Sequence, residues 1–175
     1  MLRNKADITE QDELDQFEQM MFLTRADEDL PDGELDYEHY KSIHHHFFQD
    51  VYDWAGTVRQ IRTGKGDNWF CFPEFIDGEM ERIFRELAAE NHLTDLADKA
   101  VFADRASYYI SEINAIHPFR EGNGRIQLTL LTMLAEHAGF ELNENRLDEN
   151  DFMQAMIVSF DGELRSLADQ IRRLI

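Results

Sequence analysis

The stretch His117-Pro118-Phe119-Arg120-Glu121-Gly122-Asn123-Gly124-Arg125 lies between two runs of apolar residues with helical spacing. It therefore predicts one helix, a tight loop, and the start of a second helix. Gly122 and Gly124 allow backbone conformations that a Cβ would hinder, and they bring backbone N–H groups close to a ligand. The first turn of a helix has N–H groups without main-chain partners and a partial positive charge, so this loop is a candidate anion site.

Side chains of the same loop suit the transfer of a phosphate-containing group. His117 has the only side chain here that is suited to accept a proton from an incoming hydroxyl near neutral pH. Glu121 stands beside the candidate anion site, where Mg²⁺ could bridge carboxylate and phosphate oxygens. Arg120 and Arg125 would make the cleft locally positive. A base, a metal ligand and a phosphate cradle in one short loop indicate an enzyme.

The loop resembles the signature of the Fic family (filamentation induced by cAMP), H-P-F-x-[DE]-G-N-G-R-x-x-R, without a break from His117 to Arg125. The resemblance implies AMPylation, in which AMP moves from ATP to a Tyr, Thr or Ser hydroxyl of a target protein. It implies that His117 is the catalytic base, that Phe119 anchors the loop in the core, and that Glu121 is the Mg²⁺ ligand. The nucleotide- and phosphate-binding residues would be Gly122, Asn123, Gly124 and Arg125, with Arg120 beside them.

The last position of the signature departs from the family pattern, because Leu128 replaces the second arginine. In the family that arginine typically holds the γ-phosphate and receives the glutamate of an inhibitory helix. Two alternatives therefore stay open beside AMPylation from ATP. One is a Fic-type transferase that uses another nucleotide or phosphodiester donor, and the other is a Fic-fold binding module with little activity. A packing role for Leu128 on the apolar helix surface is the simplest explanation of the change.

The family's inhibitory pattern, [ST]-x-x-x-E-[GN], has one partial match at Ser159–Glu163, which is followed by Leu164. That stretch also fits the ordinary last helices of the fold. The resemblance thus implies a toxin-like form without an N-terminal inhibitory helix. We expect its inhibitor, if it has one, to be a separate small antitoxin that acts in trans.

Composition limits the partners and the compartment. The 175 residues, 43% of them hydrophobic, predict a single domain over residues 1–175. The formal net charge is −19, which disfavours nucleic acids and anionic membranes as partners. A single cysteine, Cys71, excludes an intrachain disulfide framework, and there is no apolar signal core or membrane span. A cytoplasmic protein is the expectation, and export through a dedicated secretion system stays open as an alternative.

Helical spacing of apolar residues elsewhere predicts an all-α, or mainly α, protein, and the resemblance implies the helical bundle of the Fic fold. The helix that follows Gly124 is apolar on several faces and is predicted to be the central, buried one. The predicted helices lie at about 9–25, after Asp36, from Pro73 to near Asn91, at about 96–116, from Gly124 to Gly139, and at about 148–159 and 162–174.

Val58–Thr63 and Trp69–Phe72 predict two strands, joined by a turn at Gly64–Asn68. In Fic proteins a small β-hairpin flap at this place lies over the active site and pairs with an extended segment of the target. Lys65, Trp69 and Phe70 are therefore candidate target- or nucleotide-contacting residues of the flap. The alternative is that Trp69 and Phe70 only hold the hairpin against the core.

The run His44-His45-His46 suggests a metal site at first sight. Successive residues of a helix point about 100° apart, so the three imidazoles do not converge on one ion. We predict that one of these histidines is packed and that two are exposed.

Overall fold

The computed structural model describes residues 1–65 and 68–175, apart from the side chain of Lys65. The predicted contact residue Lys65 and the turn residues 66–67 thus lie wholly or partly outside the described part. Within that part the secondary structure is helical except for one pair of two-residue strands, which confirms the all-α prediction. The α-helices are α1 (Gln11–Ala26), α2 (Tyr37–Phe48), α3 (Ile76–Ala89), α4 (Lys99–Ile116), α5 (Asn123–His137), α6 (Glu149–Ser159) and α7 (Arg165–Leu174). Short 3₁₀ turns lie at Pro73–Phe75, Asn91–Leu93 and Glu144–Arg146.

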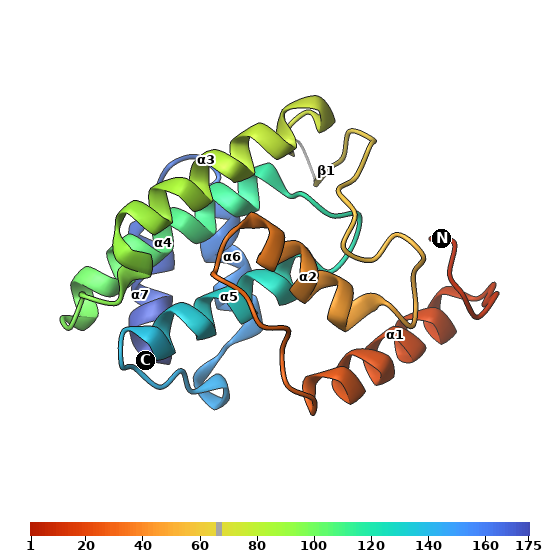
Figure 1. Ribbon diagram of the computed structural model, residues 1–175, viewed down its shortest axis with the longest axis horizontal. Coiled ribbons are helices and arrows are strands. Elements are labelled where there is room, and N and C mark those ends of the chain that lie inside the picture. Colours follow the sequence, from red (N-terminus) through yellow and green to blue (C-terminus); the bar gives the residue numbers. More distant parts are fainter. Residues whose placement is uncertain (66–67) are drawn as a thin grey trace.

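Helix α5 runs through the middle of the bundle, as predicted (Figure 1). Helices α3 and α4 lie side by side along one edge, while α1 packs on α2 at the opposite edge. Helix α4 also contacts α5, α6 and α7, and α2 contacts α5. The apolar side chains of all seven helices contribute to one buried cluster, to which α5 gives Ile126, Leu130, Leu131, Leu134 and Ala135.

Helix bounds follow local capping chemistry. Asp36 precedes α2 as predicted, and its carboxylate accepts a hydrogen bond from the N–H of His39 at 2.8 Å. Asp98 caps α4 in the same way and delays its start to Lys99, three residues later than the apolar spacing indicated. No described helix is long and apolar enough to span a bilayer.

The β-pair is shorter than predicted and closer to the turn. Strands β1 (Gly64–Lys65) and β2 (Asn68–Trp69) pair antiparallel, so β1 and the first residue of β2 lie in the stretch predicted to be the turn, Trp69 lies in the predicted second strand, and residues 58–63 form no strand. The reason is that flanking main-chain groups bind the end of α4 and the loop after it. The N–H of Arg59 donates to Pro118 O (2.9 Å), and that of Cys71 donates to Ala115 O (3.1 Å). Because the pair is so short and residues 66–67 are not described, a flap over the active site stays a prediction.

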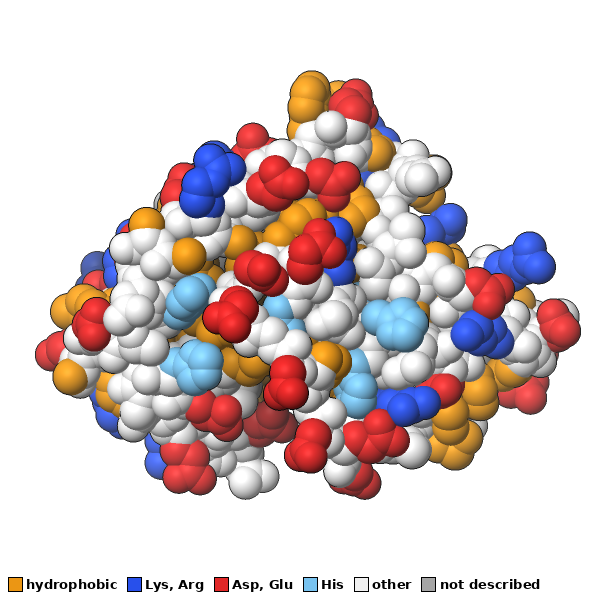
Figure 2. Space-filling view, in the orientation of Figure 1, with side chains coloured by type: hydrophobic (Ala, Val, Ile, Leu, Met, Phe, Trp, Pro, Cys, Tyr) orange, Lys and Arg blue, Asp and Glu red, His pale blue; other side chains and the backbone are white. Residues whose placement is uncertain are grey.

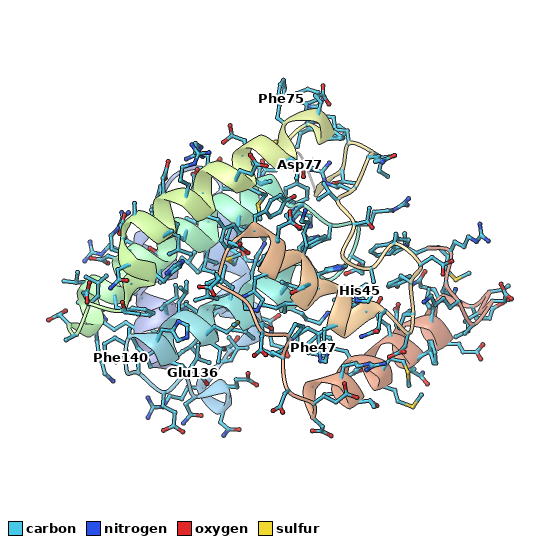
Figure 3. All side chains as sticks on the ribbon, in the orientation of Figure 1. His45, Phe47, Phe75, Asp77, Glu136 and Phe140 are labelled. Carbon is cyan, nitrogen blue, oxygen red and sulfur yellow. The ribbon has the colours of Figure 1, made fainter. Side chains whose placement is uncertain are left out.

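The histidine run also differs from the prediction, because two of its members are buried rather than one. His45 is exposed on α2 (Figure 3), whereas His46 packs on Phe47, and its Nε2 lies 3.0 Å from the carbonyl oxygen of Arg25 on α1. Phe47 in turn stacks on Phe22 of α1, with ring centroids 4.4 Å apart. The docking of α1 therefore covers a second histidine that the sequence alone left exposed.

His44 is fully buried and joins three parts of the chain. The N–H of Gly56 donates to its Nδ1 at 2.8 Å, so Nε2 carries the proton and donates to the carbonyl oxygen of Glu121 at 3.0 Å. The imidazole also stacks on the rings of Phe48 and Phe119. Burial lowers the pKa of His44 to about 4, so the neutral tautomer that holds the loop persists at neutral pH.

This lowered pKa predicts a pH-dependent stability. Unfolded His44 binds a proton near its ordinary pKa of 6.5, while folded His44 stays neutral until about pH 4. The contribution of His44 to the free energy of unfolding should therefore have its full value above pH 6.5 and fall as the pH drops toward 4. Between pH 7.5 and 5.5 this contribution should fall by about 1.4 kcal/mol. Urea unfolding of the wild type and of His44→Gln at both pH values measures the difference.

His45→Gln provides the matched control, because this neighbouring histidine is exposed. It should leave the pH dependence of the wild type unchanged, whereas His44→Gln should flatten it. Equal slopes for the wild type and both variants would contradict the role given to His44.

Candidate active site

The nine-residue loop reverses the chain between α4 and α5. His117 is the C-cap of α4 and adopts left-handed backbone angles, with φ 53° and ψ 64°, while its N–H still donates to Ile113 O at 2.9 Å. Gly122 is the N-cap of α5, with φ 80°. A left-handed conformation is uncommon for a residue with a Cβ and is found often at functional positions. The structure therefore places the predicted base at a sharp reversal, a short distance along the chain from a helix N-terminus.

Asn123 holds this reversal together with its side chain. Its Nδ2 donates to the carbonyl oxygen of Phe119 at 2.8 Å, and its Oδ1 accepts from the N–H of Phe119 at 2.9 Å. Asn123 is buried, and so is the ring of Phe119, which lies against His44 and Tyr40. The prediction that Phe119 anchors the loop in the core is confirmed. The side chain of Asn123 serves the loop itself, so any contact of Asn123 with phosphate would come from its main-chain N–H.

The two glycines of the loop have different roles. A Cβ on Gly122 would lie 2.3 Å from Cζ of Phe48, so this position combines a positive φ with close packing. Gly124 has ordinary helical angles, and a Cβ there would meet no atom of the described residues within 4 Å. The prediction that Gly124 needs a special backbone conformation is therefore wrong. Its small size instead leaves the first turn of α5 open, and no side chain caps that turn.

Glu121 and Arg125 lie beside this helix N-terminus. The Glu121 carboxylate is about half exposed, accepts a hydrogen bond from the N–H of Gly122 at 2.9 Å, and lies 3.8 Å from Nη2 of Arg125. The guanidinium of Arg125 lies over the ring of Phe48, 4.6 Å from its centroid. A half-exposed carboxylate next to uncapped helix N–H groups fits a Mg²⁺ ion that is shared with phosphate oxygens, since Mg²⁺ commonly uses one or two protein carboxylates.

Sequence reasoning missed two residues that hold Arg125. Nη2 of Arg125 pairs with Glu18 of α1 at 2.5 Å, and the other oxygen of Glu18 accepts a hydrogen bond from the hydroxyl of Tyr52. Glu18 is 9% exposed, and it lies four residues after the buried Leu14 on the same face of α1. The sequence did offer one signal for Glu18, since it is an acidic residue on an otherwise apolar helix face. Nothing in the sequence indicated that its partner is Arg125, 107 positions away.

These residues line a cavity of about 490 Å³ between α1 and the loop. Three carboxylates, from Asp15, Glu18 and Glu121, and one guanidinium, from Arg125, line it, and Arg125 lies next to Glu18 and Glu121. An anionic ligand that reached them would need further positive charge, which agrees with the metal expected at Glu121. The surface around the bundle adds to this need, because acidic side chains are spread widely over the face shown in Figure 2. The cavity is also lined by Leu2, Gln11, Asp15, Gln19, Phe22, Leu23 and Tyr52.

The aromatic residues after β1 are split between the site and the surface. Phe70 is buried, and its ring stacks on the imidazole of His117, with centroids 3.8 Å apart and planes 6° from parallel. Trp69 is 61% exposed, and the guanidinium of Arg62 lies 4.6 Å from the centroid of its ring. Phe70 is thus placed to orient His117, whereas most of the Trp69 side chain is accessible at the surface.

The remaining predicted positions lie as follows. Arg120 is exposed at the outer side of the loop. Leu128 is half-buried and packs against the core, in agreement with a packing role. The partial inhibitory match Ser159–Glu163 covers the end of α6 and the turn before α7. There Ser159 is buried, and the carboxylate of Glu163 accepts a hydrogen bond from the N–H of Arg165 at 2.8 Å, as an ordinary helix-start contact.

Comparisons with known proteins agree with this geometry. Residues 34–135 match the model of the Fic/DOC family. The chain is 59% identical over 175 residues to the probable protein adenylyltransferase y4lH of Sinorhizobium fredii, covering 100% of this chain and 91% of that protein. It is 33% identical over 168 residues to the probable protein adenylyltransferase Fic of Escherichia coli, covering 95% and 84%.

Solved structures share the fold. One is the BepC protein of Bartonella tribocorum with bound AMPPNP, with a TM-score of 0.88 and 21% identity, covering 99% of this chain and 91% of that one. With a family match over more than half of its length, and a full-length relative at 59% identity, this chain belongs to the Fic/DOC family.

Proposed function

We propose that this protein is a Mg²⁺-dependent protein adenylyltransferase that transfers AMP from ATP to a Tyr, Thr or Ser hydroxyl of a target protein. The observation that carries the proposal is the loop itself. It joins a histidine at a left-handed helix end to an uncapped helix N-terminus through a reversal that Asn123 and His44 hold rigid. The two relatives from Sinorhizobium fredii and Escherichia coli are named as probable protein adenylyltransferases, which is consistent with this proposal.

His117 would act as general base. As the target oxygen forms a bond to the α-phosphorus of ATP, its proton moves to the imidazole of His117, and the bond from the α-phosphorus to the bridging oxygen breaks. Pyrophosphate leaves. Stacking on Phe70 keeps the imidazole plane fixed before the target arrives, so little reorganisation is needed during the reaction.

The first turn of α5 would hold the phosphates. The main-chain N–H groups of Asn123 and Gly124 are directed by the helix toward its N-terminal end, and Arg125 adds a guanidinium that Glu18 keeps in place. Glu121 would hold the Mg²⁺ ion, which offsets phosphate charge when bound. Arg120 is exposed and would contribute to the local positive field that attracts the nucleotide.

The target would approach along the segment that carries β1 and β2. An extended target strand could add main-chain hydrogen bonds at this edge, with Lys65 and the exposed Trp69 as contacts. Phe70, on the same segment, would hold the imidazole of His117 in place through the stacking of the two rings. A separate small antitoxin that acts in trans, and a cytoplasmic location, are parts of this proposal that follow from the sequence alone.

A second candidate keeps the loop chemistry but changes the donor. Leu128 motivates it, because the side chain that would meet the γ-phosphate in the family pattern is apolar and packs on the core. Another nucleotide or a phosphodiester donor would then take the place of ATP. A module with little activity is the third reading, and the ordered packing of His117 speaks against it.

The first prediction from the proposed function concerns His117→Ala. With Mg²⁺ and ATP labelled at the α-phosphate, the wild type should label protein bands in a bacterial lysate, and the variant should lose this label by at least about a hundredfold. ATP affinity, measured by calorimetry, should stay within about threefold, because the phosphate-binding groups belong to α5. Parallel loss of ATP binding would mean that His117 is structural.

Labelled GTP, UTP and CTP in the same lysate separate the candidates. Label from ATP alone supports AMPylation, and label from another nucleotide supports the second candidate. Label from none of the four would contradict the proposed activity toward the proteins of that lysate and would favour the binding module.

A second prediction concerns Leu128→Arg. Leu128 lies one turn after Arg125 on α5, so an arginine there would extend along the same helix face and reach the phosphate tail. A charge-assisted hydrogen bond to the γ-phosphate should tighten ATP binding by about tenfold, with no change for AMP. Calorimetric titration with both nucleotides measures this difference, and Leu128→Met is the matched control. An equal gain for ATP and AMP would contradict the expected direction of the phosphate tail.

A further inference from the structure

Arg59 is a buried arginine that lies where the β1–β2 segment meets the end of α4. It is 2% exposed. Within the described part of the chain, its side-chain hydrogen bonds all go to main-chain carbonyl oxygens, and its own N–H donates to Pro118 O at 2.9 Å. The side-chain contacts are Nε to His117 O (2.7 Å), Nη2 to Ile116 O (3.0 Å), Nη1 to Ile61 O (2.7 Å) and Nη2 to Cys71 O (2.6 Å).

A buried arginine in this setting is energetically unusual. Among residues 1–65 and 68–175, no carboxylate forms an ion pair with Arg59, and burial lowers the pKa of its guanidinium. A buried cation without a counter-charge is strongly unfavourable unless fixed dipoles replace its water. The carbonyl groups of Ile116 and His117 are such dipoles, because they form the negative end of α4. An apolar side chain in this space would avoid the cost of removing a charge from water, but it could not bind four carbonyl groups at once.

The contacts of Arg59 join two parts of the chain, the end of α4 and the segment that carries β1 and β2. On the α4 side they reach the last carbonyl groups of the helix and that of His117, its C-cap. On the other are Ile61, before β1, and Cys71, after β2. Cys71 also donates its N–H to Ala115 O at 3.1 Å, and the preceding residue, Phe70, stacks on the His117 imidazole. A shift of this segment is therefore transmitted to the backbone and to the ring of His117.

We propose that Arg59 is a positioning residue that holds His117 and both arms of the β1–β2 segment as one unit, so that a target bound to the segment meets a correctly oriented base. This inference rests on the proposed adenylyltransferase activity for its kinetic consequence. Arg59 acts through His117 and does not itself touch the reacting atoms. Among the described residues, the groups that would bind ATP, at the start of α5 and on Arg125, form no hydrogen bond or ion pair with Arg59, so they should work independently of it.

The test compares Arg59→Met and Arg59→Lys with the wild type. Methionine removes every side-chain hydrogen bond of Arg59, whereas lysine keeps the charge but loses the planar fork that binds several carbonyl groups. Arg82→Lys is the matched control, because Arg82 also binds three partners, the carboxylates of Glu79, Glu86 and Glu112, but lies on α3 outside the site. Calorimetry with ATP and Mg²⁺, transfer of labelled AMP into lysate proteins, and amide hydrogen exchange are measured on each folded variant.

We expect ATP affinity to stay within about threefold in all variants. Transfer should fall by about a hundredfold in Arg59→Met, which is the usual cost of a small misplacement of a catalytic group, and by less in Arg59→Lys. Amide exchange should rise together at Cys71 and at His117, whose N–H groups both bind α4 carbonyl groups. Arg82→Lys should change neither transfer nor these two amides.

Several results would overturn the inference. Transfer within about threefold of the wild type in folded Arg59→Met would show that Arg59 does not position the base. Loss of ATP binding in proportion to loss of transfer would make it a general stabiliser of the fold. If the wild type itself transfers no AMP, the proposed function fails. Hydrogen exchange is then the only test of whether Arg59 joins the segment to His117. Exchange that rises at only one of Cys71 and His117 would then show that the arginine does not join them. If Arg59→Met does not fold, the same measurements on Arg59→Lys decide.

Discussion

The arrangement of the site depends on two hydrogen bonds between the side-chain amide of Asn123 and the main chain of Phe119, at 2.8 and 2.9 Å. They close the loop between α4 and α5 from the inside, with the ring of Phe119 buried in the core. Because both ends of the loop are then fixed, the base at the end of α4 and the N–H groups at the start of α5 keep a constant relation. Pre-organisation of this kind is what transfer reactions that rely on positioning and electrostatics require.

Buried polar side chains around the loop extend this constraint to the rest of the protein. Neutral His44 ties the Glu121 carbonyl to Gly56, Arg59 ties the His117 carbonyl to the β1–β2 segment, and Glu18 ties Arg125 to α1. Each is a partly or fully desolvated group whose partners come from distant parts of the chain, so each is costly to leave unpaired. The contacts of these three side chains therefore fix the loop relative to Gly56, to the β1–β2 segment and to α1.

Local signals explain which parts of this structure could be predicted. The cap at Asp36, the anchoring of the loop by Phe119 and the apolar spacing of α5 are encoded within a few residues, and the structure agrees with them. The chemical roles of the loop residues stay predictions. The positions of β1 and β2 and the burial of His46 could not be read in this way. They depend on main-chain contacts with α4 and on the docking of α1. The pairing of Arg125 with Glu18 spans 107 positions, and no periodicity in either helix indicated it.

The most direct measurement of the central claim is the identity of the phosphate product. Phosphorus NMR on wild-type protein, with ATP, Mg²⁺ and a lysate in which label is incorporated, follows which bond of ATP breaks. Attack at the α-phosphorus, which the proposed transfer of AMP requires, predicts that pyrophosphate forms in step with the AMP that is transferred. Formation of ADP in step with phosphate incorporation would instead show attack at the γ-phosphorus and would contradict the account.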